Sequence, residues 1–285
     1  MSKRSFDQQH SISKISQKSL SPAHALTENK NDETPEPEPL TKKLPTTPPR
    51  RDDDDDDDTV TTPPSDAAAE ALGEKLGAIP VYLTADGRSW YLHVKSWHPS
   101  PDENAFDAEW NLHPDDFREI TVHGRKVHEC RYSQMWGVNY PYSGAVAAAR
   151  DYLQDDEGAT VRWLVDAIND LYPRREGDRP YYNGCLQNWY EVEHRIGLHA
   201  DDERSLRDDG LPIFSVSWGG ERRFLFRAKQ NRGEVHELFL KDGDLLVMGG
   251  TCQRTHKHEV PKWRITKDPP TSRRINWTIR AFKEK

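Results

Sequence analysis

RRINWTIRAF, residues 273–282, is a predicted β-strand whose two faces differ in character. Side chains alternate between the faces of a strand. One face carries Ile275, Trp277, Ile279 and Ala281, and the other carries Arg274, Asn276, Thr278 and Arg280. The polar face could lie in water, or it could line the inside of a barrel. Inside a barrel the two arginines would need anionic partners, because an unpaired buried charge is very costly. A small dicarboxylate held by a guanidinium fork would be such a partner.

The residues from about 183 onward predict further short strands separated by turns. PIFSVSW (212–218) and RRFLFRA (222–228) flank Gly219-Gly220, and we expect them to form a hairpin. VHELFL (235–240) and DLLVMGG (244–250) flank a Lys-Asp-Gly turn and are expected to do the same. Short antiparallel strands at this spacing are typical of a sandwich or a jelly-roll barrel.

Helical patterns precede the strands. Residues 65–78, 144–154 and 160–172 are expected to form helices, the last with apolar residues repeating along one face. Residues 81–97 read as a hairpin around Asp86-Gly87. The fold class expected is therefore α+β, with a β core and flanking helices.

The N-terminal part of the chain differs in composition from the rest. Residues 1–80 hold 10 Lys/Arg and 16 Asp/Glu, whereas the remaining residues hold 30 and 32, so the net charge of −8 mostly describes the N-terminal part. Residues 1–66 contain Pro-rich stretches and seven consecutive acids, Asp52 to Asp58. Such a segment buries too little apolar surface to offset its ordering entropy, so we expect a disordered tail followed by one domain, residues 67–285. The acidic run is either a solvated spacer or a docking segment for a basic protein partner.

The cysteines and the hydropathy indicate a soluble, intracellular protein. The three cysteines form no CxxC pair, so neither a disulfide framework nor a thiolate zinc site is expected. No apolar run reaches the roughly 18 residues of a membrane span, and no signal-peptide segment is present. The basic pairs Lys42-Lys43 and Arg50-Arg51 resemble a split nuclear-import signal, so we expect a nuclear protein, with the cytoplasm as the alternative. We also expect a monomer.

A His-x-Asp pair stands in RIGLHADDERSL, residues 195–206. On a strand, His199 and Asp201 would point to the same face, as two ligands of one metal ion would. A second such pair, at His113, is read as chance because Pro114 disfavours a regular strand. QRTHKHEVPK (253–262) offers His256 or His258 as a third ligand. Two histidines and a carboxylate are typical of non-haem iron(II) oxygenases. Zinc held by the same ligands would make a hydrolase, but the paired arginines favour iron with an oxo-acid.

Residues of about 120–282 resemble the AlkB-like 2-oxoglutarate- and iron(II)-dependent dioxygenases, which demethylate alkylated nucleic acids. QNWY (187–190) is similar to the family's Asn-x-Tyr signature, LHADDE (198–203) to its His-x-Asp motif, and HEVPK (258–262) to its distal-histidine motif. RINWTIR (274–280) is similar to its Arg-x-Asn-x-x-x-Arg ending. The resemblance implies a double-stranded β-helix (jelly-roll) core over about 183–285.

The resemblance also implies the cofactors and the residues that hold them. Fe(II) would be bound by His199, Asp201 and His258, the last chosen over its neighbour by its distance from Val-Pro. Arg274 would pair with the distal carboxylate of 2-oxoglutarate. The other residues implied for the cosubstrate pocket are Asn188, Tyr190, Asn276 and Arg280. With O2 as the third reactant, the products would be succinate, CO2 and formaldehyde.

The substrate contacts implied are of two kinds. Asp202 and Glu203 match acids that face a cationic alkylated base, although two solvated acids on a turn would look the same. A nucleotide-recognition segment at about 120–145 would contribute Arg131, Tyr140, Tyr142 and Ser143, where the tyrosines stack on a base or simply pack. Cys130 stands where the family usually has proline. Five further basic residues either follow phosphates or form a solvated face: Arg222, Arg223, Arg227, Lys229 and Arg232.

The function expected is direct-reversal repair of DNA bases of the 1-methyladenine and 3-methylcytosine type. RNA demethylation by the same chemistry is the nearest alternative, because the motifs do not encode the sugar contacts that separate RNA from DNA. A protein hydroxylase or demethylase and a non-catalytic nucleic-acid-binding module are lesser alternatives.

Deletion of residues 1–66 should leave turnover of short alkylated oligonucleotides unchanged, because every candidate site residue lies beyond the predicted tail. Steady-state rates of the full-length and truncated proteins test this. A collapse of the rate on truncation would place part of the site in the tail.

Overall fold

The computed structural model describes residues 65–122, 124–142, 145–172, 180–207, 210–231, 233–262 and 273–283. All of them belong to one compact unit, residues 59–285. Of the predicted tail, only residues 65 and 66 are described, and they begin the first helix, α1 (Ser65–Leu76). The rest of the tail lies outside the described residues, so the prediction of disorder is untested.

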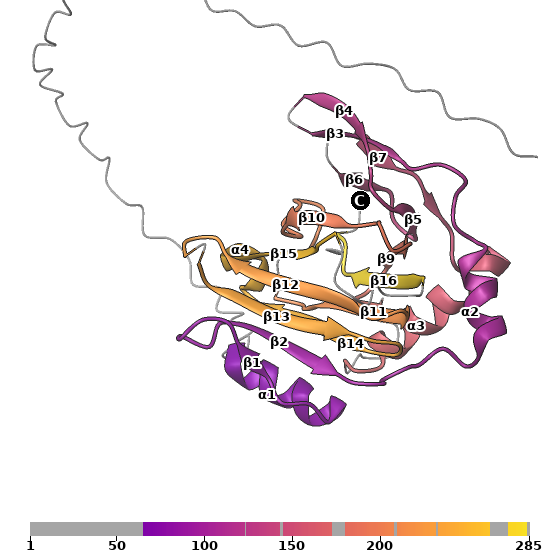
Figure 1. Cartoon of the computed structure of the whole chain (residues 1–285). Coiled ribbons are helices and arrows are strands. Elements are labelled where there is room, and N and C mark those ends of the chain that lie inside the picture. The colour runs from indigo at the N-terminus through magenta and orange to yellow at the C-terminus, as the bar shows by residue number, and fades with distance from the viewer. Residues whose placement is uncertain are drawn as a thin grey trace, which may run out of the picture. The chain divides into compact units, whose positions relative to one another are not determined.

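Two sheets form the core (Figure 1). The larger sheet has the order β1 (Val81–Tyr82), β2 (Ser89–Val94), β14 (Leu245–Gly250), β11 (Ile213–Gly219), β16 (Arg274–Arg280), β9 (Gly184–Tyr190), β5 (Tyr132–Trp136) and β8 (Ala149–Arg150). The smaller sheet has the order β10 (Ile196–His199), β15 (His256–Val260), β12 (Arg222–Ala228) and β13 (Val235–Leu240). This is the jelly-roll core that the sequence predicts.

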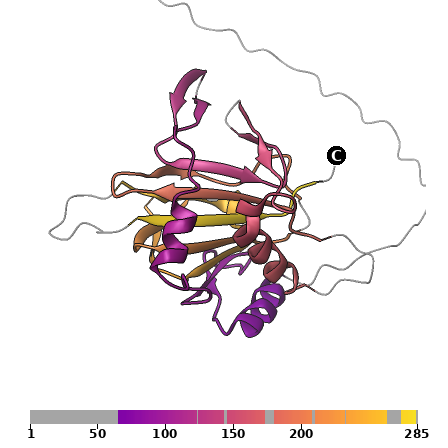
Figure 2. The same cartoon turned by 90° about the vertical axis from the view of Figure 1, so that its right-hand side faces the viewer.

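Helices and two small hairpins complete the unit. The helices are α1, α2 (Glu103–Trp110), the 3-10 turn η1 (Asp156–Gly158), α3 (Ala159–Asn169) and α4 (Cys252–Thr255). The hairpins are β3 (Glu119–Val122) with β4 (Arg125–His128), and β6 (Tyr140–Tyr142) with β7 (Ala145–Ala147). Both hairpins project from the same end of the domain in the two perpendicular views (Figures 1 and 2).

Strand β16 is buried on both faces, which confirms the barrel interpretation of its sequence. It lies in the middle of the larger sheet, between β11 and β9. Its apolar side chains, among them Trp277, share a core with Trp110 of α2 and with the apolar stripe of α3. Its polar side chains therefore face the interior between the two sheets, where the smaller sheet contributes Phe224 and Phe226 to a second apolar cluster.

The two hairpins predicted around Gly219-Gly220 and around the Lys-Asp-Gly turn are wrong, although their strands are where the sequence places them. Strand β11 pairs with β14 and β16, while β12 pairs with β13 and β15. Both turns carry the chain from one sheet to the other. A jelly roll needs such crossings because its two sheets bury one face of each strand against the other sheet.

The helix predicted over 144–154 is also wrong, because β7 and β8 occupy its first half. Ala145–Ala147 pairs with β6, and Ala149–Arg150 extends the edge of the larger sheet beside β5. Alanine is the strongest helix former, but helix propensity contributes little free energy per residue, so pairing with neighbouring strands overrides it. The helices at 65–78 and 160–172 and the hairpin at 81–97 are confirmed. Helix α2 was not expected, although Asp102 caps it by accepting a hydrogen bond from the Ala105 N–H at 2.8 Å.

Among the described residues, no helix combines the length and the apolar character that crossing a membrane requires.

Gly249 should be intolerant of a side chain. It lies opposite Trp90 in the β14–β2 pair, and a Cβ at this position would overlap the indole ring. We expect Gly249→Ala to lower the free energy of unfolding by about 1–3 kcal/mol, as overpacked cores do. Denaturant unfolding measures the change. Gly233→Ala is the control, because a Cβ at this position would meet Asn231 Oδ1 at an ordinary contact distance of 3.6 Å, so the variant should stay within about 0.5 kcal/mol of wild type. Equal effects of the two substitutions would contradict the packing seen here.

Candidate active site

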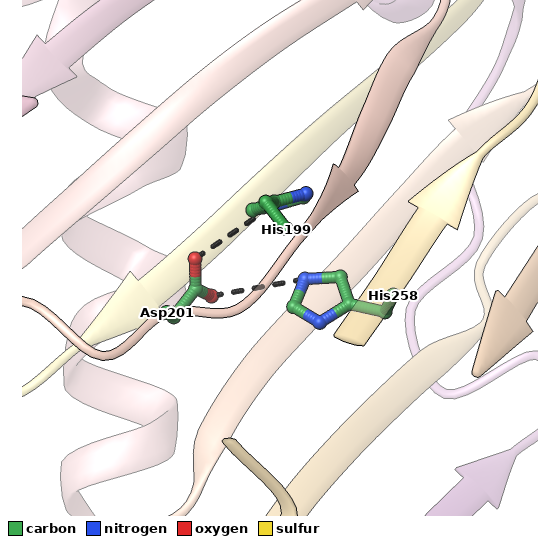
Figure 3. A group of neighbouring side chains, drawn as sticks. All are labelled: His199, Asp201 and His258. Carbon is green, nitrogen blue, oxygen red and sulfur yellow. Dashed lines mark ion pairs between the residues drawn. The ribbon is translucent and has the colours of Figure 1, made fainter. Parts of the chain in front are cut away.

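Two histidines and an aspartate from separate parts of the chain meet between the sheets (Figure 3). His199 ends β10 and lies opposite His258 of the antiparallel neighbour β15. Asp201 follows two residues after β10. One potential ligand atom from each residue lies within 4.8 Å of the others. His256 does not belong to this group: it contacts Thr255 through Nδ1 at 2.8 Å.

The distances within the group suit a cation between the three side chains. His199 Nε2 lies 3.7 Å from Asp201 Oδ1, and His258 Nε2 lies 4.0 Å from Oδ2. Both distances are too long for hydrogen bonds. Asp201 Oδ2 is buried and has no hydrogen-bond partner among the described residues. A buried carboxylate oxygen without a donor, facing two imidazoles, fits a metal ion.

Hydrogen bonding and burial prepare the three side chains to bind a metal. The Nδ1–H of His199 donates to the Gly197 carbonyl at 2.8 Å, which leaves the Nε2 lone pair toward Asp201. Burial lowers the pKa of His199, and it lowers the pKa of His258 to about 3. Burial opposes ionisation of Asp201, but Arg280 and the two histidines hold its pKa well below the usual range. At neutral pH the group therefore offers two neutral imidazoles and a carboxylate.

One pocket joins this group to every residue predicted for the cosubstrate. Its walls include Asn188, Tyr190, Arg274, Asn276 and Arg280 as well as the three candidate metal ligands. The apolar part of its wall consists of Leu186, Ile196, Phe224, Met248 and Val260. A dicarboxylate with a methylene chain needs this mixture of cationic and apolar contacts.

The guanidinium of Arg274 has hydrogen-bonding capacity left over. Its Nη2 donates to Ser217 Oγ at 2.9 Å, and its cation lies 5.1 Å from the centroid of the Tyr190 ring. Its Nε and Nη1 are buried without a hydrogen-bond partner among the described residues. Burial lowers the pKa of Arg274. Unmet donors on a buried cation fit the carboxylate of an anionic ligand.

Two other polar residues of β16 have defined partners. Arg280 Nη2 forms an ion pair with Asp201 Oδ1 at 2.9 Å, so it contacts a candidate metal ligand directly. Asn276 Nδ2 donates at 2.8 Å to Ser215 Oγ and at 2.8 Å to the Val216 carbonyl, which fixes its amide on the neighbouring strand.

The predicted substrate residues are more dispersed. Asp202 is exposed and forms an ion pair with Lys229 at 3.3 Å, and Glu203 is half-buried beside it. Tyr140 and Tyr142 belong to β6, but their side chains are outside the described part of the structure, as is all of Ser143. Arg131 is buried in the wall of the pocket itself, where its Nε donates to Asn188 Oδ1 at 2.7 Å. Its position thus favours a role beside the cosubstrate residues over contact with nucleic acid.

The basic residues considered for phosphate contact do not form a free cationic face. Arg222 is 1% exposed and donates to the Glu191 carbonyl at 2.9 Å, so it cannot reach a phosphate. The others described, Arg223, Arg227 and Lys229, pair with Glu237, Glu259 and Asp202 in turn. Arg232 lies outside the described residues.

His113 is confirmed as unrelated to the metal group. Its ring stacks on Tyr132 at 4.2 Å between centroids, and its Nδ1 lies 2.8 Å from the Pro114 carbonyl.

Two residues that support the site have no motif in the sequence. Gln253 of α4 accepts a hydrogen bond from the Asp201 N–H at 2.9 Å and so holds the backbone of a candidate ligand. Glu129 is buried beside Arg131. Only the pairing of distant segments brings either residue to the pocket, so no local pattern could have identified them.

A family model described as the 2OG-Fe(II) oxygenase superfamily matches residues 100–280. The chain belongs to this superfamily. Its cofactors are Fe(II) and 2-oxoglutarate with O2, which agrees with the histidine-aspartate-histidine group and confirms the cofactors expected.

The chain is similar to proteins named ALKBH1 and ALKBH2. DNA oxidative demethylase ALKBH2 of Mus musculus is 39% identical over 155 residues, covering 51% of this chain and 58% of the relative. DNA N(6)-methyladenine demethylase ALKBH1C of Arabidopsis thaliana is 31% identical over 162 residues, covering 52% of this chain and 35% of the relative. The solved structure of OsALKBH1 covers 67% of this chain and 97% of its own, at 21% identity and a TM-score of 0.43. The matches thus span about half the length of the curated relatives.

Replacement of His258 by alanine should abolish tight metal binding, whereas the same change at His256 should not. Both histidines are buried on β15, but only His258 faces His199 and Asp201. We expect His258→Ala to weaken Mn(II) binding by about 100-fold or more, since even changes around metal ligands cost 10–100-fold. Calorimetric titration of Mn(II), which resists oxidation, measures the affinity. An equal loss in His256→Ala would contradict the assignment.

Proposed function

We propose that this chain is a 2-oxoglutarate- and Fe(II)-dependent dioxygenase that oxidatively demethylates N-alkylated bases in DNA. The observation that carries the proposal is the single pocket lined by three candidate metal ligands and five candidate cosubstrate residues. The names of the relatives, DNA demethylases of the ALKBH1 and ALKBH2 types, support the substrate class.

Each side chain of the site then has a task. His199, Asp201 and His258 would hold iron, and the iron would bind the cosubstrate and O2 as well. Arg274 binds the distal carboxylate of 2-oxoglutarate with its unmet donors. Arg280 keeps Asp201 ionised and oriented. Asn188, Tyr190 and Asn276 complete the polar wall of the pocket.

Bound Fe(II), with 2-oxoglutarate and O2, supplies an oxidant strong enough to hydroxylate an N-methyl group. One oxygen atom enters the methyl group and the other enters succinate, and 2-oxoglutarate loses CO2. The hydroxymethyl product is a hemiaminal, which breaks its C–N bond, releases formaldehyde and restores the base.

The substrate contacts follow from the position of two segments. Asp202 and Glu203 come directly after a candidate metal ligand, where a carboxylate would favour a base carrying a positive charge. Asp202 pairs with Lys229, so a bound base would compete with that lysine. Tyr140 and Tyr142 belong to β6 and Ser143 follows it in the sequence, and we propose this stretch as part of the nucleotide-recognition segment, whereas Arg131 is buried in the wall of the cosubstrate pocket. A single chain supplies the whole site, so we propose an active monomer, and a DNA substrate would place it in the nucleus.

RNA is the second candidate substrate. The RNA replication protein of Grapevine virus A is 36% identical over 95 residues, covering 33% of this chain and 5% of that protein. The iron chemistry would be the same, and the sugar contacts would differ.

The test is formaldehyde release from 1-methyladenine and 3-methylcytosine in single-stranded DNA, duplex DNA and RNA, and from a methylated peptide. The full-length chain is incubated with Fe(II), 2-oxoglutarate and ascorbate. We expect release from methylated DNA and its loss in His199→Ala. Release from peptide alone would overturn the nucleic-acid proposal, and activity that survives His199→Ala would overturn the metal assignment.

A further inference from the structure

A buried carboxylate, Glu129, stands between strands β4 and β5 outside the set of residues with an assigned role. Its side chain is fully shielded from solvent. Oε1 accepts a hydrogen bond from Arg118 Nη2 at 2.8 Å and lies 3.4 Å from Arg131 Nη2, while Oε2 accepts from the Ser133 hydroxyl. A buried carboxylate that accepts this many hydrogen bonds is fixed in place.

Glu129 reaches the cosubstrate pocket through Arg131. While one end of this guanidinium faces Glu129, its Nε donates to Asn188 Oδ1 at 2.7 Å. Arg131 and Asn188 both line the pocket that contains His199 and Asp201. The three side chains form a chain of charge and hydrogen bonds that ends on a candidate cosubstrate residue.

The contact with Arg131 decides which end of the Asn188 amide is available. An arginine has donors and no acceptor, so it can face only the amide oxygen. The Nδ2 group is then the donor end of the amide, and its hydrogen bond to the Leu186 carbonyl is long, at 3.4 Å. An anionic cosubstrate needs a donor, so this orientation is the productive one. The reversed amide would turn its oxygen toward the anion.

Glu129 is what keeps Arg131 in this geometry. A guanidinium buried in the pocket wall would otherwise turn toward the nearest carboxylate available to it, because a buried cation needs an anionic partner. Asp201 and the bound cosubstrate are the anions of the same pocket. Glu129 thus pairs with the Nη2 end of Arg131, while the Nε of Arg131 donates to Asn188.

We propose that Glu129 is a positioning residue for 2-oxoglutarate, which acts by orienting Arg131 and, through it, the Asn188 amide. The inference rests on the proposed function, since it concerns the same cosubstrate. Arg118 lies at the base of the β3–β4 hairpin, where its carbonyl also accepts the Glu129 N–H at 2.9 Å. The hairpin is thereby anchored to the same chain of contacts.

A double-mutant cycle on 2-oxoglutarate affinity tests the proposal without turnover. Calorimetric titration of 2-oxoglutarate into the full-length, Mn(II)-loaded protein gives the dissociation constant for wild type, Glu129→Gln, Asn188→Ala and the double variant. We expect Glu129→Gln to weaken binding about tenfold, a coupling within the range for residues of one network. In the Asn188→Ala background, Glu129→Gln should weaken binding little further, because the Asn188 amide through which Glu129 acts on the cosubstrate is absent.

Two further variants separate positioning from a general loss of structure. Glu109→Gln is the matched control: Glu109 is a partly buried glutamate that accepts hydrogen bonds from Gln187 and Thr160, but neither of these partners lines the pocket. It should leave the affinity unchanged. Glu129→Asp keeps the charge and should recover part of the affinity that Glu129→Gln loses. Thermal unfolding confirms that each variant is folded at the temperature of titration.

The outcomes are distinct. Equal losses from Glu129→Gln in the wild-type and Asn188→Ala backgrounds, or no loss at all in the folded variant, would overturn this inference alone. A wild-type protein that binds Mn(II) but no 2-oxoglutarate would overturn the proposed function and the inference with it.

Discussion

The burial of two arginines on one face of β16 is the constraint on which the rest of the site depends. Arg274 and Arg280 are each less than 5% exposed in the middle of the larger sheet. A buried guanidinium is tolerated only with partners that match its charge and its donors. Arg280 has Asp201 as its partner. Arg274 has a hydroxyl and an aromatic face, and the donors that remain define where an anionic cosubstrate binds.

Each of the two sheets supplies a different part of the site. The larger sheet supplies the cations and amides through β9 and β16, whereas the smaller sheet supplies His199 and His258 through β10 and β15. Asp201 joins the two sets, since it faces both histidines and the Arg280 guanidinium. The metal group and the cosubstrate pocket are therefore one electrostatic unit. A change in either sheet that moves Asp201 would disturb both.

Further polar and charged side chains contact the residues of this unit and hold them in place. Glu129 balances Arg131 and Arg118, and Gln253 fixes the backbone of Asp201. Lys229 holds Asp202 and also donates to the Gln253 carbonyl at 2.9 Å. The contacts run from the candidate ligands outward to the hairpin β3–β4 and to the short helix α4. The segments proposed to meet the substrate are thus tied to the residues that hold the cosubstrate.

The sequence by itself indicated most strands of the two sheets, the amphipathic helix α3 and the candidate metal and cosubstrate residues that line one pocket. Alternation along β16 separates its polar and apolar faces, and the spacing of His199 and Asp201 and of the Arg-x-Asn-x-x-x-Arg ending matches a family pattern. These signals are local, because each depends on the period of one strand or on residues a few positions apart. Only the tertiary structure decided which strands pair. The turns after β11 and β13 cross between the sheets, and the alanines at 145–149 join strands, because burial against distant segments outweighs local preference. The same long-range pairing placed Gln253 against Asp201, Arg131 against Asn188 and Arg222 against Glu191.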